Sequence, residues 1–153
     1  MNPFWTAGQS LPEFPPLGED ISADVVVVGA GMTGITTAYN LANQGKSVVV
    51  IDKNGFAAGD TGFTTAHLTE ILDTNYSELG GLHGKKAAML AAESHRYAID
   101  WIESTALRAR IDCDFRRIDG YVCPNGRVKG DQLEREASYM REIGFDDCSV
   151  IEI

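Results

Sequence analysis

The feature that most constrains the fold is a run of four valines, Val25 to Val28, followed immediately by a glycine-rich turn. A continuous β-branched run of this kind is typical of a strand that is covered on both faces, as the strands of parallel sheets are. Gly29, Gly31 and Gly34 then follow in the spacing G-x-G-x-x-G. Glycine-rich turns are common, so the meaning of this hexapeptide depends on the elements around it.

Those elements predict a strand–helix–strand unit. Residues 32–44 carry no charged side chain and predict a helix that ends at Gly45 and is packed within the protein. Residues 48–51 form a second apolar run and predict a second strand. The three elements match the shortest right-handed βαβ crossover. The fold class is therefore α/β, with a Rossmann-like βαβ unit for FAD or NAD(P) that is incomplete within 153 residues and is accompanied by additional helices.

Each glycine of the motif has a steric role in binding a dinucleotide. Gly29 permits the tight turn, Gly31 lets a pyrophosphate approach the backbone, and Gly34 lets the helix pack closely on the strand. The phosphates would contact unpaired N–H groups at the positive end of the helix. The formal net charge of −9 is therefore compatible with an anionic ligand, although it argues against a nucleic-acid partner, which requires a surplus of Lys and Arg.

Asp52 follows the second apolar run, about 20 residues beyond the motif, where a carboxylate accepts both hydroxyls of an adenosine ribose. Its charge would repel a 2′-phosphate, which disfavours NADP. Residues 53–84 are rich in Gly, Thr, Ala and Asn and predict a long loop with a short helix. Small and hydroxyl-bearing residues suit a loop that lies along a long cofactor, so FAD is favoured over NAD. An ordinary glycine-rich turn and a small NAD-binding module are the alternatives.

These features together resemble those of a known family. The glycine motif, Asp52 and the segment 59–68 (GDTGFTTAHL) resemble the FAD-dependent amino-acid oxidase family, which includes D-amino-acid and glycine oxidases. The resemblance is strongest to bacterial members that carry a C-terminal Rieske iron–sulfur domain, and three further segments share it: residues 5–17, with Trp5 and Pro15-Pro16-Leu17, residues 93–96 and residues 111–115. It covers nearly all of this chain but only the N-terminal portion of such a protein, and the Rieske ligands are absent from the sequence.

The resemblance implies a role for each matching residue. By motif, the residues that would meet the pyrophosphate are Gly29, Gly31, Thr33 and Gly34. Asp52 would bind the ribose, although the family often has the longer Glu there. The resemblance places Thr64 and Thr65 along the middle of the cofactor, and Ala66 and His67 near the flavin ring. A structural hydrogen-bonding role is the alternative for His67.

The family also implies a reaction. Its substrate is a small amine or amino acid whose hydride passes to flavin N5, while the protein orients the reactants. No residue of this chain is a credible catalytic acid or base, so the catalytic residues stay unknown. The alternative is a truncated, non-catalytic fragment that binds FAD weakly or not at all.

The chain divides into an arm and a domain. Residues 1–23 contain four prolines and predict an extended arm, with a partly disordered tail as the alternative, and residues 24–153 predict the truncated N-terminal portion of an FAD-binding domain. Residues 131–143 predict a helix, and residues 112–124 and 148–153 predict strands, with a turn at Asn125-Gly126. Residues 85–109 predict a long helix, with one face made of Ala88, Ala91, His95, Ile99, Ile102 and Ala106.

Location and partners follow from what the sequence contains. Three cysteines without CxxC spacing, and His83 and His95 without partners at ligand spacing, predict reduced thiols and no metal site. No apolar run approaches the roughly 20 residues of a membrane helix, and residues 1–23 lack the basic start of a secretory leader, so we expect a cytoplasmic protein without a membrane span. A parallel sheet that is cut short exposes an unpaired edge, which favours either aggregation or a partner chain that completes the sheet.

Overall fold

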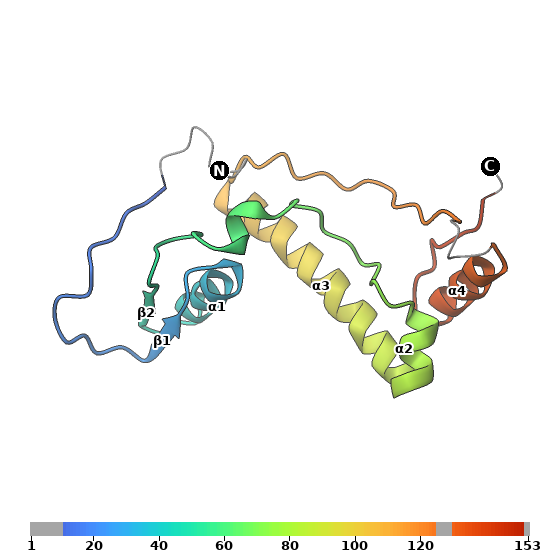
Figure 1. Cartoon of the computed structure of the whole chain (residues 1–153), viewed down its shortest axis with the longest axis horizontal. Coiled ribbons are helices and arrows are strands. Elements are labelled where there is room, and N and C mark those ends of the chain that lie inside the picture. Colours follow the sequence, from blue (N-terminus) through green and yellow to red (C-terminus); the bar gives the residue numbers. More distant parts are fainter. Residues whose placement is uncertain (1–10, 125–129, 152–153) are drawn as a thin grey trace. The chain divides into compact units, whose positions relative to one another are not determined.

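The computed structural model describes residues 11–124 and 130–151 of the chain. These residues form two compact units, Met1–His67 and Leu68–Ile153. Figure 1 shows the elements of both units in chain order.

The first unit contains a small parallel sheet. Strand β1 (Val25–Val28) pairs with strand β2 (Val48–Ile51), and helix α1 (Met32–Asn43) connects them (Figure 1). The register places Val25 opposite Val48 and Val28 opposite Ile51. This parallel pair with its crossover helix confirms the prediction of an incomplete Rossmann-like βαβ unit. The chain is a mixed α/β protein in which further helices accompany the unit.

A side-chain bridge joins the strands where they begin. The Asp24 carboxylate accepts hydrogen bonds from the Ser47 backbone N–H at 2.8 Å and from its hydroxyl at 2.9 Å. The Ser47 hydroxyl in turn accepts the Asp24 N–H at 2.9 Å. Backbone donors favour the ionised carboxylate, so they lower the pKa of Asp24. The residues just before the two strands therefore hold their register.

The prediction that the sheet is covered on both faces is wrong for the part of the chain that the structure describes. Val26 and Val28 are 54% and 82% exposed, because α1 lies only on the opposite face, where Val27 points. The prediction that α1 is packed within the protein is also wrong. Ala38 is its one buried residue among those described, while Met32 and Tyr39 are exposed.

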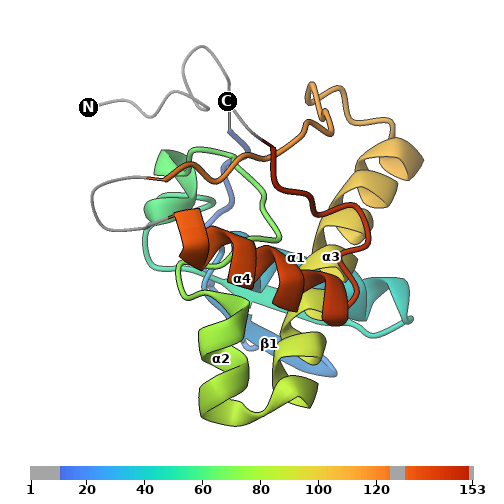
Figure 2. The same ribbon diagram turned by 90° about the vertical axis from the view of Figure 1, so that its right-hand side faces the viewer.

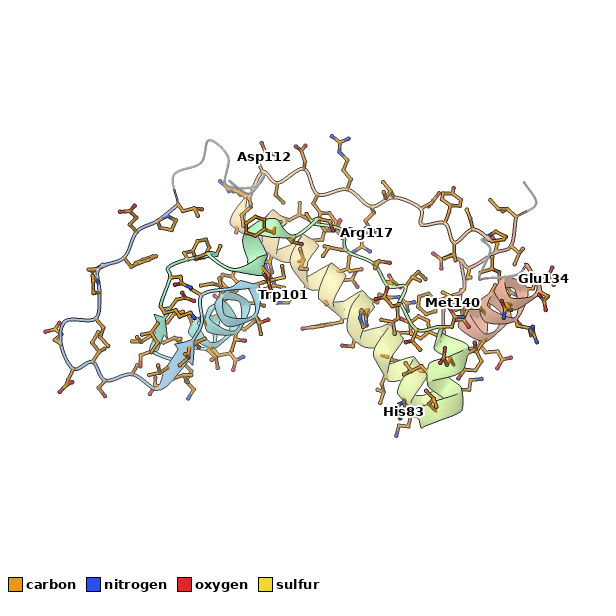
Figure 3. The ribbon with its side chains drawn as sticks, viewed as in Figure 1. His83, Trp101, Asp112, Arg117, Glu134 and Met140 are labelled. Atoms are coloured by element: carbon orange, nitrogen blue, oxygen red, sulfur yellow. The ribbon has the colours of Figure 1, made fainter. Side chains whose placement is uncertain are left out.

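The second unit has a core formed by three helices. Helices α2 (Tyr76–His83), α3 (Lys85–Ala109) and α4 (Gly130–Glu142) meet around a buried cluster, and α4 crosses beside α2 in Figure 2. Met140 lies on the inner side of α4 and Glu134 on the outer side (Figure 3). The predicted helices are confirmed. On the predicted face of α3, Ala88 and Ala106 are buried and the other four residues are half-buried, while Ala92 is also buried. The cluster consists of Tyr76, Ala88, Ala92, Met140, Ile143 and Phe145.

A buried carboxylate from α4 caps the start of α2. Glu136 accepts the backbone N–H groups of Tyr76 at 2.6 Å and Ser77 at 3.1 Å, and also the Ser77 hydroxyl. The residue at the usual capping position, Asn75, makes no side-chain cap. Glu136 therefore satisfies amides that no earlier turn of the helix can reach.

The two segments that predicted strands form none in the described part. Residues 112–124 run extended without a neighbouring strand to pair with, which is the physical reason that no strand forms. Arg117 holds this segment to α3 through Asp100 at 2.6 Å and Glu103 at 2.7 Å (Figure 3). Residues 148–151 are likewise not a strand, whereas the predicted turn at Asn125-Gly126 and residues 152–153 lie outside the described residues.

The described part of the arm, residues 11–23, contains no helix or strand. Its apolar side chains Leu11, Phe14 and Leu17 are exposed. These three side chains therefore do not anchor the arm on a folded body. Phe4 and Trp5 lie outside the described residues.

Candidate cofactor-binding site

The glycine-rich turn joins the end of β1 to the start of α1. Gly29 has a φ of +111°, in the region that favours glycine, and its N–H donates to the Ile51 carbonyl at 2.7 Å. A Cβ on Gly34 would overlap the Gly29 carbonyl oxygen and lie 3.0 Å from its carbon. Both positions therefore require glycine for the turn and the close helix–strand packing that the motif predicts.

Asp52 holds this turn from the end of β2. One carboxylate oxygen accepts the Ala30 N–H at 2.8 Å, and the other accepts the N–H groups of Asn54 at 2.7 Å and Gly55 at 3.0 Å. The amides of Ala30 and Asn54 contribute most to lowering the pKa of Asp52, so the carboxylate is charged at neutral pH. The Ala57 N–H donates to the Ala30 carbonyl at 3.0 Å. The segment after β2 thus binds both backbone groups of Ala30.

Thr61 is a site residue that the sequence analysis missed. It lies in the short 3₁₀ helix η2 (Asp60–Phe63), and its hydroxyl accepts the Met32 N–H at the start of α1 at 2.9 Å. A Cβ on Gly31 would lie only 3.2 Å from this hydroxyl. The available signal was a hydroxyl-bearing residue within Asp60-Thr61-Gly62, in the segment that was predicted to lie along the cofactor.

The turn presents open hydrogen-bond donors. Among the residues described, the backbone N–H groups of Gly31, Thr33 and Gly34 have no acceptor. The first amides of a helix lack intrahelical partners, and the dipole makes this end of α1 favourable for negative charge. A side chain at Gly31 would crowd the Thr61 hydroxyl beside these donors. These donors match the pyrophosphate of a dinucleotide.

Residues 64–67 form the loop that follows η2. The hydroxyls of Thr64 and Thr65 accept the N–H groups of Ala66 at 3.2 Å and His67 at 3.4 Å. Ala66 has a φ of +55°, which is uncommon for a residue with a side chain. Asp52 and Thr61 both contact the glycine turn. Thr64, Thr65, Ala66 and His67 lie farther along the chain in the same unit.

The family of the chain follows from comparison with known proteins. Residues 24–152 match the family described as FAD dependent oxidoreductase. The match covers most of the chain, which therefore belongs to this family, whose cofactor is FAD. The glycine turn described above is the part of the structure that fits the pyrophosphate of that cofactor.

Individual relatives agree with the family. The chain is 40% identical to a putative Rieske 2Fe-2S iron–sulfur protein of Bacillus subtilis over 94% of its own length, and 30% identical to a probable oxidoreductase, OrdL, of Haemophilus influenzae over 90%. It is 27% identical to the gamma-glutamylputrescine oxidoreductase of Escherichia coli over 84%. The matches span 28%, 32% and 30% of these relatives, so the chain corresponds to less than a third of their length. No solved structure gives a significant match.

None of the helices in the described ranges is long and apolar enough to cross a membrane. Across those same ranges, no three His, Cys, Asp or Glu side chains come together as a metal site.

Proposed function

We propose that this chain is the FAD-binding portion of an oxidoreductase that acts on amines or amino acids. The observation that carries the proposal is the set of open N–H groups at Gly31, Thr33 and Gly34, on a turn that only glycine can form. An acidic chain can bind an anionic cofactor in this way, because backbone amides and a helix dipole supply the attraction without a basic patch. Membership in an FAD-dependent family supports the choice of cofactor.

The proposal assigns a contact to each residue of the site. The pyrophosphate meets the turn of Gly29, Gly31, Thr33 and Gly34. Gly31, Thr33 and Gly34 donate N–H groups to it, whereas Gly29, whose N–H donates to Ile51, shapes the turn. Asp52 binds the adenosine ribose. Thr64 and Thr65 line the middle of the cofactor, and Ala66 and His67 lie nearest the flavin. The exposure of Thr65, Ala66 and His67 supports this assignment, because a ligand could reach them.

The reaction class comes from the family and its relatives. FAD, when bound, supplies the acceptor for a hydride from the substrate amine at its N5 atom. The name of the gamma-glutamylputrescine oxidoreductase supports an amine or amino acid as substrate. The residues of this chain bind and orient the cofactor, and we assign none of them as a catalytic acid or base. Membership in the fold family supports the reaction class but does not identify the substrate.

The remaining parts of the proposal concern organisation. Residues 1–23 act as an arm and residues 24–153 as the cofactor domain. A partner chain completes the sheet, and the sheet of only two strands, β1 and β2, in the described residues supports this, because each strand has one edge without a neighbour. The chain works in the cytoplasm, which the free thiols of Cys113, Cys123 and Cys148 support.

Purification with added FAD tests the proposed function. The 153-residue chain is incubated with FAD or NAD, separated from free ligand by gel filtration and examined by absorbance. We expect a flavin spectrum with FAD and little retained NAD. Gly31→Val should abolish retention, because its side chain would fill the approach beside Thr61. The matched control Gly120→Val, where a side chain meets no neighbour, should retain FAD. A colourless wild-type chain would contradict the proposal, and retention of NAD alone would favour a small NAD-binding module.

A further inference from the structure

Two aspartates bridge β1 and β2 at opposite ends. Asp24 bonds to Ser47 before the strands begin, and Asp52 bonds to Ala30 after they end. Both carboxylates are exposed and both accept backbone N–H groups, which lower their pKa values. They differ in what they hold, because Asp24 joins two strand starts whereas Asp52 joins the phosphate-facing turn to the segment after β2.

The bonds around Ala30 fix the turn from both sides. Ala30 lies between Gly29 and Gly31, and it is buried. Its N–H donates to Asp52 at 2.8 Å, and its carbonyl accepts the Ala57 N–H at 3.0 Å. The peptide planes on both sides of Ala30 are therefore constrained. The Gly31 N–H, which faces the proposed ligand, lies in the second plane, which Ala57 holds. Asp52 fixes the first plane directly, and it supports the second through its bonds to Asn54 and Gly55, in the segment that leads to Ala57.

The Asp52 carboxylate is also nearly saturated. Ionised, it offers about four lone-pair positions. Three of them accept the N–H groups of Ala30, Asn54 and Gly55. These bonds lie within the chain, so they act on the turn independently of any ligand. One position is left for a ribose hydroxyl, rather than the two that the sequence analysis assigned to it.

We infer, building on the proposed function, that Asp52 is a positioning residue for the glycine turn as well as a ribose contact. It holds Ala30 so that the N–H groups of Gly31, Thr33 and Gly34 converge on the pyrophosphate, and it binds one ribose hydroxyl rather than two. Its contribution to cofactor affinity therefore does not depend only on the ribose. Removing its charge should weaken the binding of a pyrophosphate even when no ribose hydroxyl is present.

Hydrogen exchange of the full chain without ligand tests the positioning role. Asp52→Asn keeps the size of the side chain but replaces one acceptor oxygen with a donor, so it cannot accept all three N–H groups. We expect the amides of Ala30, Asn54 and Gly55 to exchange faster in this variant. The matched variant Asp24→Asn should speed exchange at Ser47 and leave Ala30 unchanged. Unchanged exchange at Ala30 in Asp52→Asn would overturn the inference.

A pair of ligands separates the two roles of Asp52. ADP carries both ribose hydroxyls, and 2′,3′-dideoxy-ADP carries neither, while both keep the pyrophosphate. We expect Asp52→Asn to bind each ligand about tenfold more weakly than the wild-type chain. The variant loses the hydrogen bonds that the charged carboxylate accepts, and hydrogen bonds to charged groups are stronger than those between neutral groups. Loss of the negative charge alone would instead strengthen binding of these anions. If Asp52→Asn loses affinity for ADP but not for 2′,3′-dideoxy-ADP, then Asp52 contacts only the ribose, and the positioning role is overturned.

The two measurements distinguish an error in the proposed function from an error in the positioning role. If the wild-type chain binds neither ADP nor FAD, the proposed function is wrong, and hydrogen exchange still decides whether Asp52 positions the turn. If Asp52→Asn does not fold, the wild-type chain supplies the test. Its Ala30, Asn54 and Gly55 amides should exchange more slowly than those of Gly31 and Thr33. Equal rates would contradict the inference.

Discussion

At the scale of single residues, the glycine turn depends on close contacts that tolerate no side chain. Gly34 is the clearest case, because its Cα lies against the Gly29 carbonyl. The contact joins α1 directly to the end of β1. Gly34 therefore contributes to the stability of the βαβ unit before it contributes to any ligand.

We expect Gly34→Ala to destabilise the first unit by about 1–3 kcal/mol, the usual cost of forcing extra atoms into a packed site. The added methyl would overlap backbone, which cannot move aside as a flexible side chain can. Hydrogen exchange of the β1 and β2 amides measures the effect. Gly59→Ala is the control, since a Cβ there meets nothing within 4 Å. Equal protection in the two variants would show that the close contact is unimportant.

At the scale of elements, α2 packs against α4 through a glycine. A Cβ on Gly80 would overlap the Tyr139 hydroxyl and lie 2.6 Å from Cζ of the ring. The next residue, Gly81, has open space at the same position. Gly80 and Gly81 are adjacent in α2, and they thus differ in whether a residue of α4 lies over them.

This pair allows a matched test of the α2–α4 contact. Gly81→Ala should stabilise the second unit by about 0.5–1 kcal/mol, because alanine favours the helix over glycine. Gly80→Ala has the same helix gain but must displace Tyr139, so we expect it to be about 1–3 kcal/mol less stable than Gly81→Ala. Urea unfolding followed by Trp101 fluorescence gives both values. Gly80→Ala at least as stable as Gly81→Ala would mean that the helices pack differently.

The elements also show how much of the structure could be predicted. Strands 25–28 and 48–51 and the helices were predictable because local signals determine them: β-branched runs, apolar spacing and terminal glycines. Residues 112–124 carry strand-like composition but form no strand, since a strand requires a partner that local sequence does not specify. The Glu136 cap on α2 and the Thr61 contact with α1 were missed for the same reason. Each joins residues far apart in the chain.

At the scale of the whole molecule, the two units contain titratable groups that act at opposite ends of the pH range. In the first unit, backbone donors lower the pKa values of Asp24 and Asp52 below about 3.9, the ordinary value. A lowered pKa stabilises the fold above the unfolded pKa, and this contribution is lost as pH falls through the folded pKa. In the second unit, burial raises the pKa of Tyr76, and nearby Glu70 adds to the shift. That contribution is complete below the ordinary value of about 10 and is lost as pH rises through the folded pKa.

We therefore expect acid to loosen the first unit and alkali the second. Below about pH 4, exchange protection of Val25–Val28 should fall more than that of α3, and Asp24→Asn combined with Asp52→Asn should reduce this dependence. Above about pH 10, the urea concentration at the midpoint of unfolding, followed by Trp101 fluorescence, should fall. Tyr76→Phe should make this decrease smaller. If the two units unfold together at low pH or at high pH, the expectation that their groups titrate independently is contradicted.

The central claim is that the glycine turn binds FAD, and a titration tests it most directly. FAD is titrated with the wild-type chain, Gly31→Val and Gly120→Val, with flavin fluorescence as the signal and ADP as competitor. We expect saturable binding that ADP reverses for the wild-type chain and Gly120→Val, and none for Gly31→Val. No saturable change with the wild-type chain, or equal affinity in Gly31→Val, would contradict it.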